Sequence, residues 1–247
     1  MFINTKNRTT QSEIMDDFAL EGEVLRDALD KIASINQLLG GNKLTLEGVK
    51  TILKNHPVEE PITLLDVGCG NGDMLRTLAD YADDNKLKFN LIGIDANQFT
   101  IHHAEKLSTH YPNIRYRCED IFDKEFDQLH YDIVLCTLTL HHFKEEEILK
   151  LLHVFKTNAR LGIVINDLQR SSISYRLFQG LCFVFRLNSM SKKDGLVSIL
   201  RGFKKTELQQ FSKQLHFKNY SIEWKWAFRY QWIIISEQVQ INYEIKE

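Results

Sequence analysis

The sequence predicts an α/β fold: a seven-stranded, mostly parallel sheet with helices on both faces and a helical cap. Three observations support this prediction. Beyond Pro61, short apolar runs bounded by Gly, Asp or Asn alternate with stretches of helical periodicity, as in repeated β-α units. The first run ends in a glycine-rich turn. The 247 residues are 43% hydrophobic and 26% charged, which is enough for a folded core without disulfides or metals.

The first 60 residues are expected to form an N-terminal helical cap, and residues 61–247 the main domain. Apolar residues recur at helical spacing from Ser12 to about Ile35, and Gly40-Gly41 follows as a stop signal. A second helix is expected over Leu46–Leu53. Because no internal repeat or proline-rich linker marks a boundary, one domain with a cap is the simplest organisation.

Strands and helices are expected to alternate in the main domain. The apolar runs predict these strands: Thr63–Val67, Phe89–Ile94, Ile114–Arg117, Ile133–Cys136 and Gly162–Ile165. The helical stretches between them are Asp73–Ala82, Gln98–Tyr111 and Lys144–Phe155. A helix between successive strands favours parallel pairing, since a parallel connection has to cross over the sheet.

The alternation breaks over residues 171–205, which are expected to form an insertion. An apolar helix punctuated by arginines, Ile173–Leu187, leads into a polar loop, Asn188–Asp194. The helix could be a lid over an apolar ligand or a helix packed into the core. Arg170, Arg176 and Arg201 could meet an acidic ligand, although exposed arginines need no such role.

The regular pattern resumes with a helix from Thr206 to about Leu215. Ser221–Phe228 and Tyr230–Ile235 then predict an antiparallel pair at the sheet edge. Trp224, Trp226 and Phe228 alternate like one face of a strand, which favours a place in the core.

Charge and cysteine content exclude several classes of protein. The net charge of −2 gives no field that would attract nucleic acid. The four cysteines are too widely spaced for a zinc knuckle or a redox dithiol, and reduced thiols in a cytoplasmic protein are expected. Met1–Thr10 has no signal-peptide core and no apolar stretch is long enough to span a bilayer, so no integral membrane association is expected.

The strongest functional signal is the segment from Asp66 to Asp73, a strand end followed by three glycines at alternate positions. Glycines let the backbone turn tightly and approach a ligand, while free N–H groups at the next helix start reach its polar atoms. The dinucleotide fingerprint would have glycine where Asp73 stands, so pyrophosphate binding is disfavoured. The Asp66 carboxylate suits the ammonium and sulfonium groups of S-adenosylmethionine better than a phosphate. The predicted contacts in this turn are Asp66, Gly68, Cys69, Gly70 and Gly72.

Two further strand ends carry acids. Asp95 ends the second strand, where a carboxylate can accept hydrogen bonds from both ribose hydroxyls, with Ala96 beside it. Asp95 as a helix cap is the simpler alternative. After the third strand, Asp120 and Ile121 are the predicted adenine contacts, although Glu119 could serve in place of Asp120.

These motifs together resemble the class I methyltransferases, whose fold is Rossmann-like, and in particular the small-molecule branch with the ubiquinone and menaquinone methyltransferases. The resemblance runs from about Leu64 to Asp167. Asp66–Gly72 looks like the first motif of that family and Tyr131–Phe143 like the fourth. The resemblance implies S-adenosyl-L-methionine as cofactor and adds Cys136 and Thr137 to the cofactor-binding residues.

Methyl transfer from a sulfonium is an in-line displacement, so a base is optional. If the acceptor is a hydroxyl, His141 or His142 is placed to remove its proton, since an imidazole titrates near neutral pH. Both could instead shape the pocket or cap the next helix. Asn166-Asp167 resembles the metal pair of catechol-type enzymes, but Thr137 stands where the matching acid is needed, so no metal is expected.

The sequence therefore predicts methylation of a small-molecule acceptor, with oxygen on a phenolic, quinone-like or lipid-like molecule first and carbon second. A methyltransferase-like subunit that binds a partner without catalysis is an alternative. An NAD-dependent oxidoreductase is disfavoured by Asp73 and by the acids at the third strand. The oligomeric state has no signal in the sequence.

Overall fold

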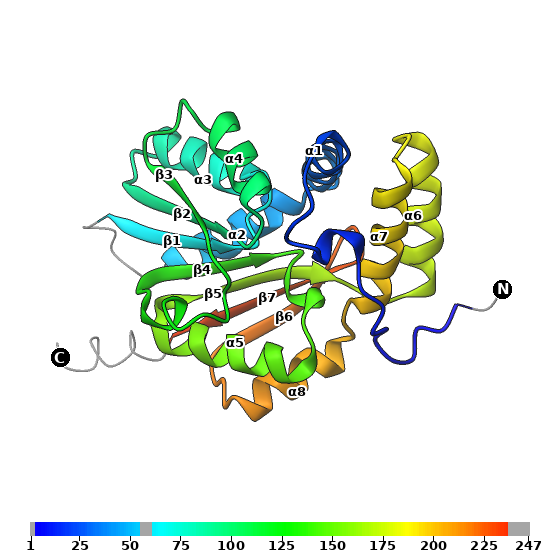
Figure 1. The fold of residues 1–247 in the computed structure, drawn as a ribbon. Coiled ribbons are helices and arrows are strands. Elements are labelled where there is room, and N and C mark those ends of the chain that lie inside the picture. Colours follow the sequence, from blue (N-terminus) through cyan, green and yellow to red (C-terminus); the bar gives the residue numbers. More distant parts are fainter. Residues whose placement is uncertain (1–2, 55–60, 237–247) are drawn as a thin grey trace.

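The computed structural model describes residues 3–54 and 61–236, which form one seven-stranded sheet in the order β3-β2-β1-β4-β5-β7-β6 (Figure 1). The first five strands are parallel, and β7 runs antiparallel to both of its neighbours. The strands are β1 (Ile62–Val67), β2 (Phe89–Asp95), β3 (Ile114–Cys118), β4 (Tyr131–Thr137), β5 (Ala159–Leu168), β6 (Tyr220–Lys225) and β7 (Arg229–Ile235). The predicted fold class is confirmed.

Helices cover both faces of the sheet. They are α1 (Glu23–Leu38), α2 (Gly41–Leu53), α3 (Asp73–Asp84), α4 (Gln98–Leu107), α5 (Glu145–Asn158), α6 (Ser172–Val184), α7 (Ser189–Arg201) and α8 (Lys205–Gln214). Ile52 of α2 and Leu75 of α3 belong to the core on one face, and Phe155 of α5 and Phe211 of α8 to the core on the other. Among the described helices, none is long and apolar enough to cross a membrane.

The strand order creates the place for a ligand. From β1 the chain continues outward through β2 and β3, and then returns to place β4 on the other side of β1. The connections after β1 and β4 therefore leave in opposite directions. Such a switch point opens a crevice at the carboxyl ends of the strands, where ligands of open α/β sheets bind.

The spacing predicted one long helix from Ser12 to about Ile35, but the N-terminal segment does not form one. A short 3-10 helix, η1 (Ile14–Asp16), is followed by irregular chain, and α1 begins only after Gly22, whose φ is +97°. Its amides bond elsewhere: the backbone N–H groups of Ile14 and Met15 donate to the Asp194 carboxylate over 2.8 and 3.0 Å. In Figure 1 this segment, in dark blue, runs between the strand ends and α7.

The predicted polar loop Asn188–Asp194 is also wrong, because α7 begins at Ser189. The Asn188 side chain caps this helix by accepting from the Ser191 amide over 2.8 Å. The serines and lysines of its first turns were therefore mistaken for a loop. Likewise α2 starts at Gly41 instead of Leu46. The predicted cap boundary adjoins residues 55–60, which lie outside the described residues.

The tryptophans near the C-terminus do not belong to the core, contrary to the prediction. Trp224 is 48% exposed and Trp226 63% exposed. The reason is that β6 is an edge strand that ends at Lys225, so that Trp226 lies in the turn before β7. The ring of Phe228 packs against both tryptophans, at centroid distances of 6.0 and 5.8 Å.

Candidate active site

A cavity of about 1330 Å³ lies at the carboxyl ends of the strands, between the sheet, the N-terminal segment, α1, α6 and α7. Its volume exceeds the range of about 300–1,000 Å³ usual for a single-ligand pocket, so a cofactor and an acceptor both fit. Most of the predicted site residues line it: Asp66, Gly68, Cys69, Gly70, Asp95, Ala96, Glu119, Asp120, Ile121, Thr137, His141 and His142.

Two predicted contacts lie elsewhere. Cys136 is buried in the core beneath the cavity. Gly72 precedes α3, and a Cβ there would lie 2.0 Å from the hydroxyl of Tyr116. A larger residue at position 72 would clash with Tyr116, so packing explains why glycine stands there.

The glycine turn after β1 presents bare backbone to the cavity. Gly68 and Gly70 have φ values of +69° and +53°, in the left-handed region that favours glycine. A Cβ on Gly68 would lie 2.5 Å from the side chain of Thr139, whereas one on Gly70 would meet nothing closer than Leu29 at 4.0 Å. The open side of Gly70 faces the cavity, as a close approach of ligand to backbone requires.

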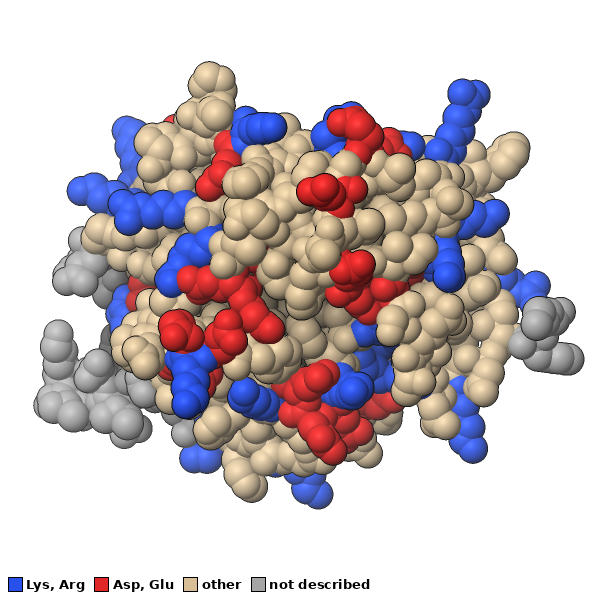
Figure 2. Space-filling model, in the orientation of Figure 1, with Lys and Arg blue, Asp and Glu red and all other residues tan. Residues whose placement is uncertain are grey.

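Buried carboxyl groups beside this turn favour a cationic ligand. Asp66 is 2% exposed and its Oδ1 has no hydrogen-bond partner. Burial, together with the charges of Asp73 and Asp95, raises the pKa of Asp66 well above its usual range. Acids outnumber lysine and arginine around the cavity, and Figure 2 shows acidic side chains gathered near the middle of that face. A bound ammonium or sulfonium group would stabilise the ionised form of Asp66.

Asp95 stands at the end of β2, as predicted. Its Oδ2 accepts from the Gly70 amide over 3.3 Å and its Oδ1 from the Asn97 amide over 3.0 Å. Burial raises the pKa of Asp95 although both bonds oppose that rise. The cap of α4 is Asn97, whose side chain accepts from the Thr100 amide. Asp95 is therefore not needed as a helix cap.

The acids after β3 both border the cavity. Asp120 is exposed, and its Oδ1 accepts from the Phe122 amide over 2.9 Å. Glu119 forms an ion pair with Arg117, while its Oε2 is buried without a hydrogen-bond partner. An orphaned acceptor suits an adenine amino group, so Glu119 is at least as well placed as Asp120.

A buried histidine–aspartate pair lies at the cavity wall, which His141 lines and Asp167 supports from behind. His141 is 2% exposed; its Nδ1 lies 2.7 Å from Asp167 Oδ1, and its amide donates to Asp167 Oδ2 over 3.1 Å. Burial alone would raise the pKa of Asp167, but the charge that His141 carries when protonated and the hydrogen bonds from His141 and the Leu168 amide outweigh burial, so the pKa is lowered. An ionised Asp167 requires the proton on Nδ1, so Nε2 is left free to accept a proton. His141 Nε2 has no hydrogen-bond partner.

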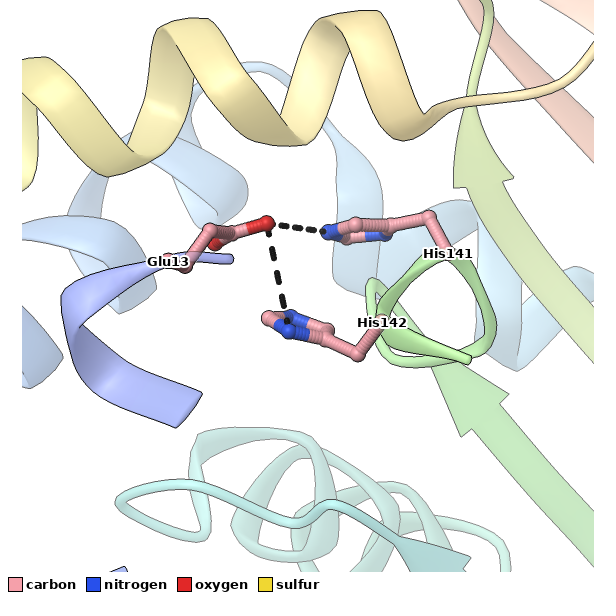
Figure 3. Close-up of side chains that lie close together, drawn as sticks. All are labelled: Glu13, His141 and His142. Carbon is pink, nitrogen blue, oxygen red and sulfur yellow. Dashed lines mark ion pairs between the residues drawn. The ribbon is translucent and has the colours of Figure 1, made fainter. Parts of the chain in front are cut away.

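Four more side chains lie around this histidine: Glu13, Asp16, His142 and Arg201. Figure 3 shows Glu13, from the N-terminal segment, pointing toward the rings of His141 and His142, at 3.7 and 3.9 Å from their nearest nitrogens. Burial raises the pKa of Glu13. Asp16 lies 2.6 Å from both His142 Nδ1 and Arg201 Nη1, and although burial opposes it, these bonds lower the pKa of Asp16 far below its usual value.

A family of known proteins is similar to the central part of the chain. Residues 64–161 match the family described as a methyltransferase domain. The matched segment begins in β1 and ends in β5, and so contains the glycine turn, the strand-end acids and His141.

Protein 235L of Invertebrate iridescent virus 6, which is named as a methyltransferase, is 24% identical over 147 residues. That alignment covers 59% of this chain and 48% of the viral protein, so the chain spans about half the length of the curated relative it matches.

Solved methyltransferase structures share the fold. The plantazolicin methyltransferase BpumL in complex with SAH has a TM-score of 0.63 at 19% identity, over 85% of this chain and 89% of BpumL. The magnesium protoporphyrin IX methyltransferase ChlM from Synechocystis PCC 6803, with bound SAM, has a TM-score of 0.55 at 13% identity, over 90% and 89%. The DszA carbon methyltransferase has a TM-score of 0.60 at 17% identity, over 80% and 54%.

One group of side chains beside the cavity has the spacing of a metal site. Among the described residues, Glu13, His141 and His142 each offer a ligand atom, all within 4.8 Å of one another. Arg201 Nη1 lies 3.6 Å from Glu13 Oε1, and this fixed positive charge opposes a dication. Asn166 donates to Gly41 and Thr45, outside any such set. That no metal is used stays a prediction.

Sequence reasoning missed the residues that complete the site. The helical spacing from Ser12 to about Ile35 predicts an ordinary helical position for Glu13, and the sequence suggests Asp167 only as a metal ligand. Arg170 and Arg201 are buried instead of exposed: Arg170 Nη2 lies 2.7 Å from Glu207 Oε1 and Arg201 is bonded to Asp16. One signal in the sequence could have indicated the pair: Asp167 lies at the carboxyl end of β5, and His141 follows the neighbouring strand β4.

Proposed function

We propose that this chain is an S-adenosylmethionine-dependent methyltransferase that methylates an oxygen atom of a small, largely apolar acceptor. The observation that carries the proposal is one cavity that joins a cation-favouring turn, Asp66 to Gly70, to the free Nε2 of His141. The methyltransferase family match over residues 64–161 supports the same activity.

The residues around the glycine turn fit the cofactor. Asp66 and the backbone of Gly68 and Gly70 would hold the charged amino-acid end, Asp95 the ribose, and Glu119 or Asp120 the adenine. Bound S-adenosylmethionine supplies an electrophilic methyl group on a sulfonium. Without a partner, the buried Asp66 is destabilising, so a cationic ligand would relieve an existing cost.

The chain's part in the reaction is to position the acceptor and remove its proton. His141 Nε2 takes the proton of the acceptor hydroxyl, and the ionised Asp167 stabilises the imidazolium that forms. Asp167 also fixes the ring, since it accepts from the side chain and the amide of His141. Held close and shielded from water, the oxygen attacks in line.

The acceptor is proposed to be phenolic, quinone-like or lipid-like, because the far wall of the cavity is apolar. That wall includes Leu29 and Ile32 of α1 and Leu177, Phe178 and Leu181 of α6. Residues 1–60 would act as a cap and residues 171–205 as a lid. The resemblance to the ubiquinone and menaquinone methyltransferases supports the quinone-like class.

Carbon methylation is the second candidate. It needs no acidic hydroxyl, and the fold shared with a carbon methyltransferase leaves it open. The His141–Asp167 pair favours oxygen methylation. A hydroxyl has to lose its proton, and a histidine held by a carboxylate can accept that proton. A non-catalytic subunit would need neither His141 nor Asp167.

Methyl transfer to candidate acceptors tests the proposal. The protein is incubated with S-adenosylmethionine labelled with tritium on its methyl group and a panel of phenols, hydroquinones and fatty acids, and label in the acceptor is counted. We expect transfer to at least one class and a loss of at least a hundredfold in His141→Gln, with His153→Gln, an exposed histidine on α5, as the matched control. Label that reaches only carbon would contradict oxygen methylation, and none at all would favour the non-catalytic reading.

A further inference from the structure

Arg229 is a buried guanidinium at the cavity wall. It is the first residue of β7, it is 3% exposed, and it borders the cavity. Its Nη1 donates to Asn36 Oδ1 over 2.7 Å, and its Nε is buried without a hydrogen-bond partner. Burial lowers the pKa of Arg229 to about 10, an effect that the charge of Asp167 opposes.

The other buried arginines in the described part of the chain have carboxylate partners. Arg170 is paired with Glu207 over 2.7 Å, and Arg201 with Asp16 over 2.6 Å. Arg229 has no ion pair with any described acid; Asp167, whose charge acts on it, already accepts two hydrogen bonds from His141. A buried cation without a partner is strongly unfavourable. An anionic ligand would provide the missing partner.

The surrounding backbone holds this guanidinium in place. At Gly41, the start of α2, a Cβ would lie 2.8 Å from Arg229 Nη1 and 1.9 Å from Asn36 Oδ1. Only glycine leaves room for both groups. The guanidinium is therefore fixed before any ligand arrives, which lowers the entropy lost on binding.

We propose that Arg229 binds the carboxylate of the methyl acceptor, so that the acceptor is an apolar carboxylic acid; this rests on the proposed function. A planar guanidinium matches a carboxylate in geometry. The many acids around the cavity disfavour a doubly charged phosphate more than a single carboxylate. Arg229 pairs with Leu168 across β5 and β7, next in sequence to the Asp167 that holds His141, so the anchored acid lies near the His141 base.

Calorimetric titration of octanoate and of its neutral analogue octanamide into protein saturated with S-adenosylhomocysteine tests this site. Octanoate should bind at least tenfold more tightly than octanamide. Arg229→Gln should abolish the difference, Arg229→Lys should keep part of it, and Arg176→Gln, at an exposed arginine of α6, should keep all of it. Equal binding of the two compounds to the wild type, or a difference that survives in Arg229→Gln, would overturn the proposal.

The amino-acid carboxylate of the cofactor is the other possible partner. Titration of S-adenosylhomocysteine and of methylthioadenosine, which lacks that carboxylate, into Arg229→Gln separates the two. We expect both to bind as they bind the wild type; a tenfold loss for S-adenosylhomocysteine alone would assign Arg229 to the cofactor and overturn the acceptor role. If the wild type takes up neither, the proposed function fails, and octanoate titrated into ligand-free protein tests the anion site by itself.

Thermal unfolding of ligand-free variants provides the check on folding. Arg229→Met removes an uncompensated charge and should unfold at no lower a temperature than the wild type. Arg170→Met breaks a buried ion pair and should unfold at a lower temperature. An equal loss in both variants would make Arg229 a structural residue and overturn the proposal.

Discussion

Replacement of Asp167 by asparagine should reverse the protonation of His141. Asp167 Oδ1 accepts from His141 Nδ1 over 2.7 Å and from the Leu168 amide over 2.6 Å, while Oδ2 accepts from the His141 amide over 3.1 Å. Three donors therefore face two carboxylate oxygens. An asparagine must turn its NH₂ group toward at least one of them, and the side chain of His141 is the donor that can change.

The imidazole can respond by moving its proton to Nε2, so that Nδ1 accepts from the new amide. Nε2, which lies 3.7 Å from Glu13 Oε1, would then no longer be a base. General base catalysis contributes about 10²–10⁴ in rate, so kcat should fall by about that factor. Binding of S-adenosylhomocysteine should stay within about twofold, since Asp167 does not border the cavity.

Nitrogen-15 NMR of the imidazole rings at pH 8 reads the tautomer without any acceptor. The wild type should carry the His141 proton on Nδ1, and Asp167→Asn should carry it on Nε2. His153→Gln serves to assign the exposed ring signals, since that residue lies on the surface of α5. The same tautomer in both proteins, or an unchanged kcat, would refute the role given to the pair.

Three further predictions concern the cofactor site and the cap. Asp95→Ala should weaken S-adenosylhomocysteine binding by about 2–3 kcal/mol, measured by calorimetry, because charge-assisted bonds are lost; unchanged affinity would mean that the ribose lies elsewhere. The pKa of Asp66 in the unfolded chain is the ordinary value of 3.8, whereas burial keeps the folded carboxyl protonated to higher pH. The contribution of Asp66 to stability should therefore fall as pH rises above about 4. Asp66→Asn should therefore be increasingly more stable than the wild type from pH 4 to pH 8 in urea unfolding without ligand, and a constant difference would contradict the assignment. EDTA should leave methyl transfer unchanged, because Arg201 beside Glu13 opposes a dication; loss of activity restored by Zn²⁺ would show that Glu13, His141 and His142 form a metal site.

The sheet could be predicted from the sequence because its central parallel strands, β1, β4 and β5, are buried on both faces. Runs such as Leu64-Leu65 and Ile133-Val134 are continuously apolar and end in glycine or polar residues, which marks the strand and its carboxyl end together. The proposed cofactor residues follow from the same pattern: Asp66, the glycine turn and Asp95 lie at strand ends, and most of them line the cavity.

The second half of the site depends on contacts between distant segments, which no local pattern records. Glu13 meets His141 across 128 positions of sequence only because Asp194, on α7, holds the amides of the N-terminal segment. In the sequence, Arg229 looks like an ordinary strand residue. Only the structure, in which Asn36 of α1 and Gly41 of α2 pack against it, shows that it has no ion-pair partner. Such residues require the three-dimensional structure.

Direct titration of S-adenosylmethionine and S-adenosylhomocysteine into the folded protein in a calorimeter is the most direct test of the cofactor assignment. One molecule of either compound should bind per chain, with protons released as Asp66 ionises, and NAD should give no heat. Absence of binding of both compounds to protein with a cooperative unfolding transition would contradict the assignment of this cavity to methyl transfer.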